Sequence, residues 1–290
     1  EIMFPQFMCI GAQKAGTTWL HHNMIDHAEI WLPPIKELHY FNKLSTEPAL
    51  IALAREPLSR FRLRRLLRRA RREMVAGQSV GWYMNYFLMP RSDRWYGSLF
   101  TPAPGQIAGE LTPEYSILDL EVVQRIHRQM PDLKIIYLLR NPIERTWSQV
   151  NRKHRQALLG DDFNDDTVVE EFMQQEHPHA RSYYFRNLEV WESVFPKDQI
   201  FVGFYEQVQD EPEILLRDIY QFLGVDASQK YIHRPSEKKV NVGRYEPIPP
   251  RWGRFLAERY YGQIQSLHKR FANAATSSWL SMAEEYRRSN

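Results

Sequence analysis

Several features that mark special classes of protein are scarce or absent in this chain of 290 residues. There is one cysteine, Cys9, which excludes an internal disulfide, and its apolar neighbours favour a small buried side chain over a nucleophile. No apolar run approaches the roughly 20 residues that span a bilayer, and no secretory signal is visible. Because no Gly/Ser-rich linker or internal repeat interrupts the chain, we expect residues 1–290 to form a single domain.

Negative charge is scarce in one stretch of the sequence. Between residues 55 and 72, nine arginines stand against one glutamate, so this stretch carries +8 and the rest −5, although the whole chain carries only +3. Leucines interleave with the arginines, which predicts a basic amphipathic helix in an insertion over residues 55–76. Such a helix either packs by its leucine face and leaves its arginines in water, or binds an anionic polymer, an acidic carrier protein or an anionic membrane surface.

Short apolar strands alternate with helical patterns along the chain. The expected strands are Met8–Ile10, Ile107–Leu111, Leu133–Leu139 and Ile200–Tyr205. The expected helices are Thr17–Asp26, Leu120–Met130, Pro142–Arg155, Tyr183–Phe195, Pro212–Leu223 and Trp252–Phe271. This alternation is typical of the α/β class, in which a parallel sheet and the helices on its faces form three layers. Ligands of such folds bind at the carboxyl ends of the strands.

The first strand runs straight into a loop, Gly11–Thr18, of sequence Gly-Ala-Gln-Lys-Ala-Gly-Thr-Thr. Two glycines five apart, with Lys14 between them and two threonines behind, suit a loop that wraps a phosphate with backbone N–H groups and a helix N-terminus. The alternative is an ordinary strand-to-helix turn, which leaves the lysine and the threonine pair unexplained. We therefore predict an anion site in this loop.

The loop departs from the Walker A motif of nucleotide hydrolases. That motif ends in Gly-Lys-Ser/Thr, whereas this chain has Gly16-Thr17-Thr18 and places its lysine earlier. The strand Leu133–Leu139 is followed by Arg140, where a magnesium site needs an aspartate, and arginine binds phosphate rather than metal. A P-loop nucleotide kinase or NTPase is therefore disfavoured. It stays an alternative, as does a non-catalytic anion-binding module.

Arg140 opens a second candidate phosphate motif. Pro142 suits the first turn of a helix, which places Ser148 about two turns into that helix. Arg140 and Ser148 are then expected to grip one phosphate together. The alternative is a solvated arginine and a surface serine.

The two phosphate motifs together resemble those of the sulfotransferases that use 3′-phosphoadenosine 5′-phosphosulfate (PAPS) and release adenosine 3′,5′-bisphosphate. The resemblance implies a P-loop-kinase-like sulfotransferase fold and an enzyme that needs no metal, because lysine, arginine and backbone dipoles stabilise the charge. Lys14 is expected to stabilise the leaving phosphate. The cofactor contacts that the resemblance implies are Gly11, Gln13, Lys14, Ala15, Gly16, Thr17, Thr18, Arg140, Ser148 and Tyr184.

Further blocks follow the order seen in heparan sulfate glucosaminyl 3-O- and N-sulfotransferases and in related bacterial sulfotransferases, so the likeness covers most of residues 4–225. These blocks are Lys36–Asn42, Gly81–Tyr83, Gly109–Tyr115, Arg181–Tyr184 with Trp191 and Phe195-Pro196, and Phe222–Gly224. Leu111 stands where those enzymes usually have lysine, and Asn42 where several have aspartate. The disulfide common in the 3-O enzymes is missing as well. The donor assignment survives these departures, but the sugar acceptor does not follow from the resemblance.

Glu37 is the expected general base. Transfer of a sulfuryl group from a phosphate to a hydroxyl or amine needs a base beside the acceptor and positive charge beside the bridging oxygen. Pro33 and Pro34 predict an extended segment, in which Glu37 and His39 point to the same side and share a catalytic site. The alternatives are a surface carboxylate for Glu37 and a core histidine for His39.

The acceptor is not fixed by the sequence. We expect Trp82, Tyr83, Glu110 and Tyr115 to line the acceptor cleft. A saccharide, including a polyanionic one, is the first expectation, and a lipid, a small natural product and a carrier-bound acyl chain remain open. No nucleic-acid partner is expected, and membrane contact through the arginine-rich stretch stays open.

A basic loop is expected near the C-terminus, over residues 237–250. It loosely resembles the loop that closes over the 3′-phosphate in sulfotransferases, which implies cofactor contacts from Lys239, Asn241, Gly243 and Arg244. The chain begins at Glu1 without an initiator methionine. We therefore expect a cytoplasmic protein or a part of a larger polypeptide, or a protein of the Golgi lumen where a leader or anchor has been removed.

Overall fold

The computed structural model of the chain describes residues 3–43, 80–157, 166–232 and 247–288. The arginine-rich insertion at 55–76 therefore lies outside the described residues. The same holds for four residues that we expected at the 3′-phosphate, namely Lys239, Asn241, Gly243 and Arg244.

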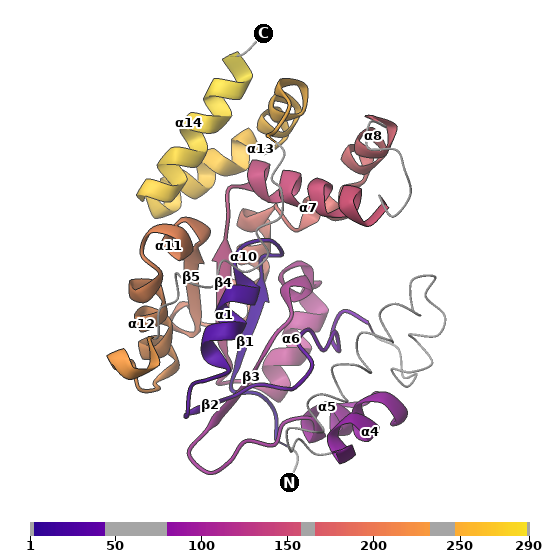
Figure 1. Ribbon diagram of the computed structural model, residues 1–290, viewed down its shortest axis with the longest axis vertical. Helices are drawn as coiled ribbons and strands as arrows, with labels where there is room; N and C mark the ends of the chain where they lie inside the picture. Colours follow the sequence, from indigo (N-terminus) through magenta and orange to yellow (C-terminus); the bar gives the residue numbers. More distant parts are fainter. Residues whose placement is uncertain (1–2, 44–79, 158–165, 233–246, 289–290) are drawn as a thin grey trace.

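Five parallel strands form one sheet in the order β2-β3-β1-β4-β5 (Figure 1). They are β1 (Phe7–Gly11), β2 (Ile30–Trp31), β3 (Ile107–Leu111), β4 (Lys134–Leu139) and β5 (Ile200–Phe204). β1 is the central strand and is buried along its whole length, with Phe7 level with Gly109 of β3. A Cβ at Gly109 would lie 2.2 Å from the Phe7 ring, so this close approach requires glycine.

Helices cover both faces of the sheet, which confirms the predicted three-layer α/β fold (Figure 1). On one face α1 (Thr17–Met24) lies beside α12 (Pro212–Leu223), where the Tyr220 hydroxyl donates to the Asn23 carbonyl at 3.2 Å. On the other face α6 (Leu120–Gln129) lies beside α10 (Tyr184–Glu192), and the His127 ring meets Phe195 edge-on. The connections β1-α1-β2 and β3-α6-β4 run in opposite directions across the sheet, and right-handed crossovers then place their helices on opposite faces.

The remaining helices extend the two ends of this core. Their bounds are α4 (Val80–Leu88), α5 (Asp93–Ser98), the 3-10 helix η1 (Pro113–Ile117), α7 (Pro142–Ala157), α8 (Asp166–Gln174), α9 (Glu176–Ala180), η2 (Lys197–Gln199), α11 (Tyr205–Asp210), η3 (Gln229–Tyr231), α13 (Pro250–Phe271) and α14 (Ala274–Arg288). α13 and α14 form a hairpin at the carboxyl end of the sheet (Figure 1). Trp279 of α14 is buried there against Phe204, and its indole N–H donates to Glu206 Oε1 at 2.5 Å.

Within the described residues, the strands and helices expected from the sequence are present, with ends that differ by a few residues at most. The sequence patterns missed β2, α4, α5, α8, α9, α11 and α14. Most of these elements are shorter than the window in which a hydrophobic period can be recognised.

Candidate active site

The phosphate-binding loop joins the carboxyl end of β1 to the N-terminus of α1, as predicted. Gly16 caps α1 with a left-handed backbone, φ 92°, and Lys14 also has a positive φ of 75°. At Gly16 a Cβ would be strained by this backbone and would come within 3.2 Å of Val208, so the loop needs glycine there. The first amides of α1 thus point into the loop, where they favour an anion.

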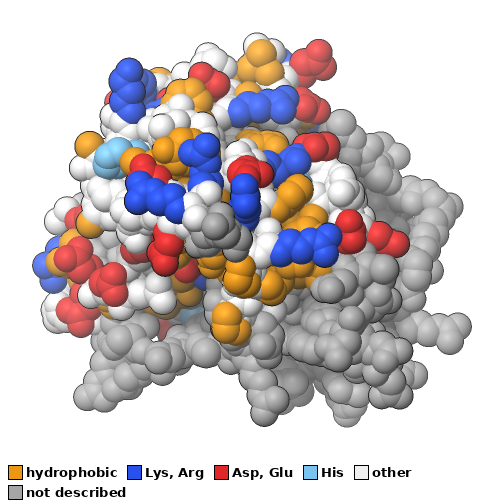
Figure 2. Space-filling model, turned by 90° about the horizontal axis from the view of Figure 1, so that it is seen from above, with side chains coloured by type: hydrophobic (Ala, Val, Ile, Leu, Met, Phe, Trp, Pro, Cys, Tyr) orange, Lys and Arg blue, Asp and Glu red, His pale blue; other side chains and the backbone are white. Residues whose placement is uncertain are grey.

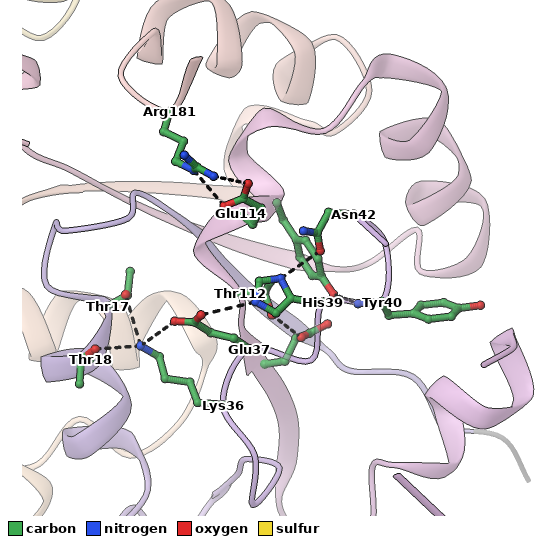
Figure 3. Close-up of polar contacts among 12 residues, drawn as sticks. Thr17, Thr18, Lys36, Glu37, His39, Tyr40, Asn42, Thr112, Glu114 and Arg181 are labelled. Carbon is green, nitrogen blue, oxygen red and sulfur yellow. Dashed lines mark hydrogen bonds and ion pairs between the residues drawn. The ribbon is translucent and has the colours of Figure 1, made fainter. Parts of the chain in front are cut away.

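Lys36 connects this loop to Glu37 (Figure 3). Its ammonium donates to Thr18 Oγ1 at 2.9 Å and to Thr17 Oγ1 at 3.5 Å, and it lies 3.6 Å from Glu37 Oε1. Only 13% of the Lys36 side chain is exposed, and this burial lowers the pKa of Lys36 against the opposing charge of Glu37. Sequence reasoning missed Lys36, although its place directly before the predicted base was a usable signal.

Glu37 and His39 meet, as predicted, but through a different backbone. His39 Nε2 lies 3.6 Å from Glu37 Oε2, and His39 Nδ1 is 3.2 Å from Asn42 Oδ1 (Figure 3). The expected extended segment was wrong: both residues are left-handed, with φ 67° at Glu37 and 54° at His39, and no strand forms there. The two side chains converge because of these turns and not through the two-residue period of a strand.

The Glu37 carboxylate is 40% exposed. Partial burial raises its pKa, but the contact with His39 and the positive charges of Lys36 and Arg152 outweigh burial, so the pKa of Glu37 lies below its ordinary value. Glu37 is therefore ionised at neutral pH, which is the form a base requires. Arg152, on α7, is a second cation of this site that sequence reasoning missed.

Arg140 ties the end of β4 to the phosphate loop. Its guanidinium donates to the Lys14 carbonyl at 3.2 Å and to Glu144 Oε2 at 3.3 Å, and it lies 4.5 Å from the centroid of the Tyr205 ring. Ser148 is nearly buried on α7, two turns beyond Pro142. Tyr184 is fully buried beside the backbone of Arg140. The two sequence motifs thus come together at one edge of the sheet.

The four residues expected at the acceptor are all buried and hydrogen-bonded or packed within the protein. Glu110 is fully buried, where it accepts from the hydroxyls of Tyr96 and Thr112, and burial raises its pKa. The Tyr115 hydroxyl accepts from the Tyr40 amide at 2.9 Å.

The Trp82 indole N–H donates to the Leu99 carbonyl at 2.8 Å, and Tyr83 packs edge-on against Trp82. These contacts bury the four side chains within the protein. Leu111, which replaces the usual lysine, is also buried.

A carboxylate–guanidinium pair lies above Glu37 and His39 (Figure 3). Arg181 donates to both oxygens of Glu114, at 2.9 and 2.6 Å, and His177 Nε2 is 3.5 Å from the same carboxylate. Sequence reasoning had Arg181 only as part of a family block and did not single out Glu114. The pair joins η1 to the segment before α10 and so fixes one side of the site.

In the parts of the chain that the structure describes, no group of three His, Cys, Asp or Glu residues is arranged to hold a metal ion. No described helix is both long enough and apolar enough to cross a bilayer.

Comparison with known proteins identifies the family of this chain. Residues 4–241 match the sulfotransferase domain family. The membrane-associated sulfotransferase kil1 of Dictyostelium discoideum is 22% identical over 85% of this chain, and human bifunctional heparan sulfate N-deacetylase/N-sulfotransferase 2 is 24% identical over 78%. The chain spans 61% of the length of the first relative and 23% of the second.

Solved structures with the same fold include two bacterial proteins. A sulfotransferase from Alicyclobacillus acidocaldarius superposes with a TM-score of 0.64 at 20% identity, covering 96% of this chain and 99% of that one. The sulfotransferase domain of the Synechococcus PCC 7002 olefin synthase gives 0.55 at 17% identity, covering 100% and 90%. Both confirm the predicted sulfotransferase fold. With the family match over most of its length, the chain belongs to the sulfotransferase family.

Proposed function

We propose that this enzyme transfers a sulfuryl group from PAPS to a hydroxyl or amine of a saccharide, with Glu37 as the base. The observation that carries the proposal is the continuous contact from the phosphate loop to Glu37. Lys36 touches the hydroxyls of Thr17 and Thr18 on one side and the carboxylate on the other. A donor phosphate in the loop and an acceptor at Glu37 then lie at the two ends of one transfer path.

The loop and its surroundings fit the donor. The left-handed cap at Gly16 and the α1 amides provide backbone donors for the 5′-phosphosulfate, and Lys14 belongs to the same loop. Arg140 and Ser148 are assigned to the 3′-phosphate. The Arg140 guanidinium already contacts the Lys14 carbonyl, which puts its charge next to the phosphate loop. Because Glu144 now pairs with Arg140, binding of the 3′-phosphate replaces or shares this contact.

The reaction is a single in-line displacement. The acceptor oxygen or nitrogen forms a bond to sulfur while the bond between sulfur and the bridging phosphate oxygen breaks. Glu37 takes the acceptor proton, and the electron pair of the broken bond stays on the phosphate, where Lys14 stabilises it. His39 Nε2 lies 3.6 Å from the Glu37 carboxylate and orients it. The products are the sulfated acceptor and adenosine 3′,5′-bisphosphate.

The proposed saccharide acceptor rests on the heparan sulfate N-sulfotransferases among the relatives. The test is incubation with sulfur-labelled PAPS and a panel of acceptors: glucosamine oligosaccharides, a polyanionic saccharide, a phenol, a lipid alcohol and a carrier-bound hydroxyacyl chain. We expect label on a saccharide. Label on the lipid, phenol or acyl chain alone would support the sulfotransferase activity but overturn the proposed saccharide acceptor.

The Glu37→Gln variant tests the base with that acceptor. It keeps the shape of the side chain but accepts no proton, so turnover should fall by about a hundredfold or more while the bisphosphate still binds. Glu121→Gln, on the exposed side of α6, is the matched control and should be silent. Near wild-type turnover in Glu37→Gln would remove it as the base and turn attention to His39.

Nucleotide binding separates this proposal from a kinase or NTPase. Adenosine 3′,5′-bisphosphate should stabilise the protein against heat, by a few kcal/mol at saturating ligand. ATP with magnesium should do little. The reverse pattern would favour the kinase.

A further inference from the structure

Arg145 is a fully buried cation beside the residues assigned to the 3′-phosphate, and it takes no part in the proposed transfer step. It lies in α7, three residues before Ser148, so the two side chains leave neighbouring points of one helix. Its amide donates to the Asn141 carbonyl at 2.8 Å, directly after Arg140. Arg145 is also close enough to Tyr184 for the two side chains to interact electrostatically.

The hydrogen-bond partners of the Arg145 guanidinium are uncharged. It donates to Ser182 Oγ, to Gln149 Oε1 at 2.8 Å, to Thr146 Oγ1 at 3.0 Å and to the Pro178 carbonyl at 2.8 Å. Within the described part of the chain, no Asp or Glu forms an ion pair with it. Burial lowers the pKa of Arg145, but a guanidinium stays protonated in proteins. Its hydrogen bonds are therefore satisfied, while its charge is not neutralised.

We propose that Arg145 is a positioning residue for the donor, whose charge draws the 3′-phosphate to Arg140 and Ser148 without touching it. The proposal rests on the function proposed above. A charge in a protein interior costs free energy to bury unless an opposite charge lies nearby. The 3′-phosphate supplies that opposite charge when the donor binds. Solvent weakens this attraction less than it weakens one at the surface, because the guanidinium is out of water.

The hydrogen bonds of Arg145 explain why it acts at a distance. Its side chain has five N–H donors, and four protein acceptors already hold them in place. The charge is therefore fixed before the donor binds. Arg140 differs in this respect, because it pairs with the carboxylate of Glu144, which a 3′-phosphate replaces or shares.

Calorimetry with two nucleotides that differ by the 3′-phosphate alone tests this role. In Arg145→Gln, which removes the charge, we expect the affinity for adenosine 3′,5′-bisphosphate to fall by about tenfold and the affinity for adenosine 5′-phosphate by less than about threefold. Arg145→Lys keeps the charge and should bind the bisphosphate within about threefold of wild type. Thr146→Val is the matched control, because it removes a hydrogen bond of the same cluster and leaves the charge. It should bind the bisphosphate as wild type does.

A structural role for Arg145 gives different results. Equal losses for the two nucleotides in Arg145→Gln, or equal losses of bisphosphate affinity in Arg145→Gln and either Arg145→Lys or Thr146→Val, would overturn the proposal. Wild-type affinity in Arg145→Gln would overturn it as well. Melting temperatures of the free variants detect damage to the fold, and Arg145→Met, which fills a similar space, replaces Arg145→Gln if that variant does not fold. If neither neutral variant folds, the charge serves the fold and the proposal fails. If the wild-type protein does not bind the bisphosphate, the proposed function itself fails.

Discussion

The residues of the candidate site are held in unusual backbone conformations. Lys14, Glu37 and His39 all have positive φ without being glycine. Such conformations each cost about 1–3 kcal/mol and persist only where the surroundings impose them. The Tyr115 hydroxyl supplies part of that support, because it accepts from the backbone amides of both Tyr40 and Phe41, directly after His39. Tyr115 thus supports the backbone of the site, and its contact with the acceptor stays a prediction from the sequence.

The contact between Glu37 and His39 leads to a prediction about the pH dependence of turnover. The contact with His39 is the largest of the effects that lower the pKa of Glu37. A base with a lowered pKa stays active from neutral pH downward, and loses activity only as the pH falls through that pKa. His39→Ala removes this contact, so the pKa of Glu37 should rise and the acidic limb of the kcat profile should move to higher pH.

The measurement is the pH dependence of kcat for wild type and His39→Ala, with the fold checked by circular dichroism at each pH. His22→Ala, on the exposed side of α1, serves as the control and should leave the acidic limb in place. An acidic limb at the same pH in His39→Ala and wild type would mean that His39 does not lower the pKa of Glu37.

At the scale of elements, the two phosphate motifs meet because β1 and β4 are parallel neighbours. The carboxyl ends of parallel strands lie at one edge of a sheet, so the loop after β1 and Arg140 after β4 are brought together by the topology. The Arg140 guanidinium can contact the Lys14 carbonyl because of this arrangement.

This arrangement predicts that Arg140 and Ser148 contribute more to the binding of a ligand with a 3′-phosphate than to the binding of one without it. Arg140→Ala should weaken binding of adenosine 3′,5′-bisphosphate by about 1.5–3 kcal/mol, and Ser148→Ala by about 1 kcal/mol. Both should affect adenosine 5′-phosphosulfate much less, because it lacks the 3′-phosphate. Calorimetry with the two ligands makes the comparison. If Arg140→Ala weakens both ligands equally, its contact with the loop carbonyl is the more important one and the residue supports the loop.

For the molecule as a whole, the described residues do not include the most positively charged part of the sequence. On the face seen from above, Lys and Arg side chains are interspersed with Asp and Glu, and hydrophobic side chains lie between them (Figure 2). The strongest concentration of positive charge in the sequence, residues 55–72, lies outside the described residues. Capture of an anionic acceptor by this stretch therefore stays a prediction from the sequence.

Replacement of Arg60, Arg64, Arg68 and Arg71 by glutamine tests that prediction. With a polyanionic acceptor, KM for the acceptor should rise and its dependence on salt should flatten, while KM for PAPS stays nearly unchanged. With a small neutral acceptor the same substitutions should be almost silent, since solvated arginines add little to stability. Unchanged KM and salt dependence with a true polyanionic substrate would rule out electrostatic capture.

The sequence by itself determined the features that depend on neighbouring residues. The strand–loop–helix at Gly11–Thr18, the arginine after β4 and the alternation of strands and helices follow from turn chemistry and hydrophobic period, which act over a few residues. These features were enough for the α/β fold and the sulfotransferase family.

Which side chains share the site depends on the tertiary packing of the chain. Lys36 reaches Thr18 across 18 positions of sequence, and the Tyr115 hydroxyl reaches the Tyr40 amide across 75. The turn at Glu37 and His39 is left-handed, which the two prolines before it did not indicate. Glu110 and Tyr115, which the sequence placed at the acceptor, are fully buried. Contacts of this range are set by how the elements pack, and a local pattern does not contain that information.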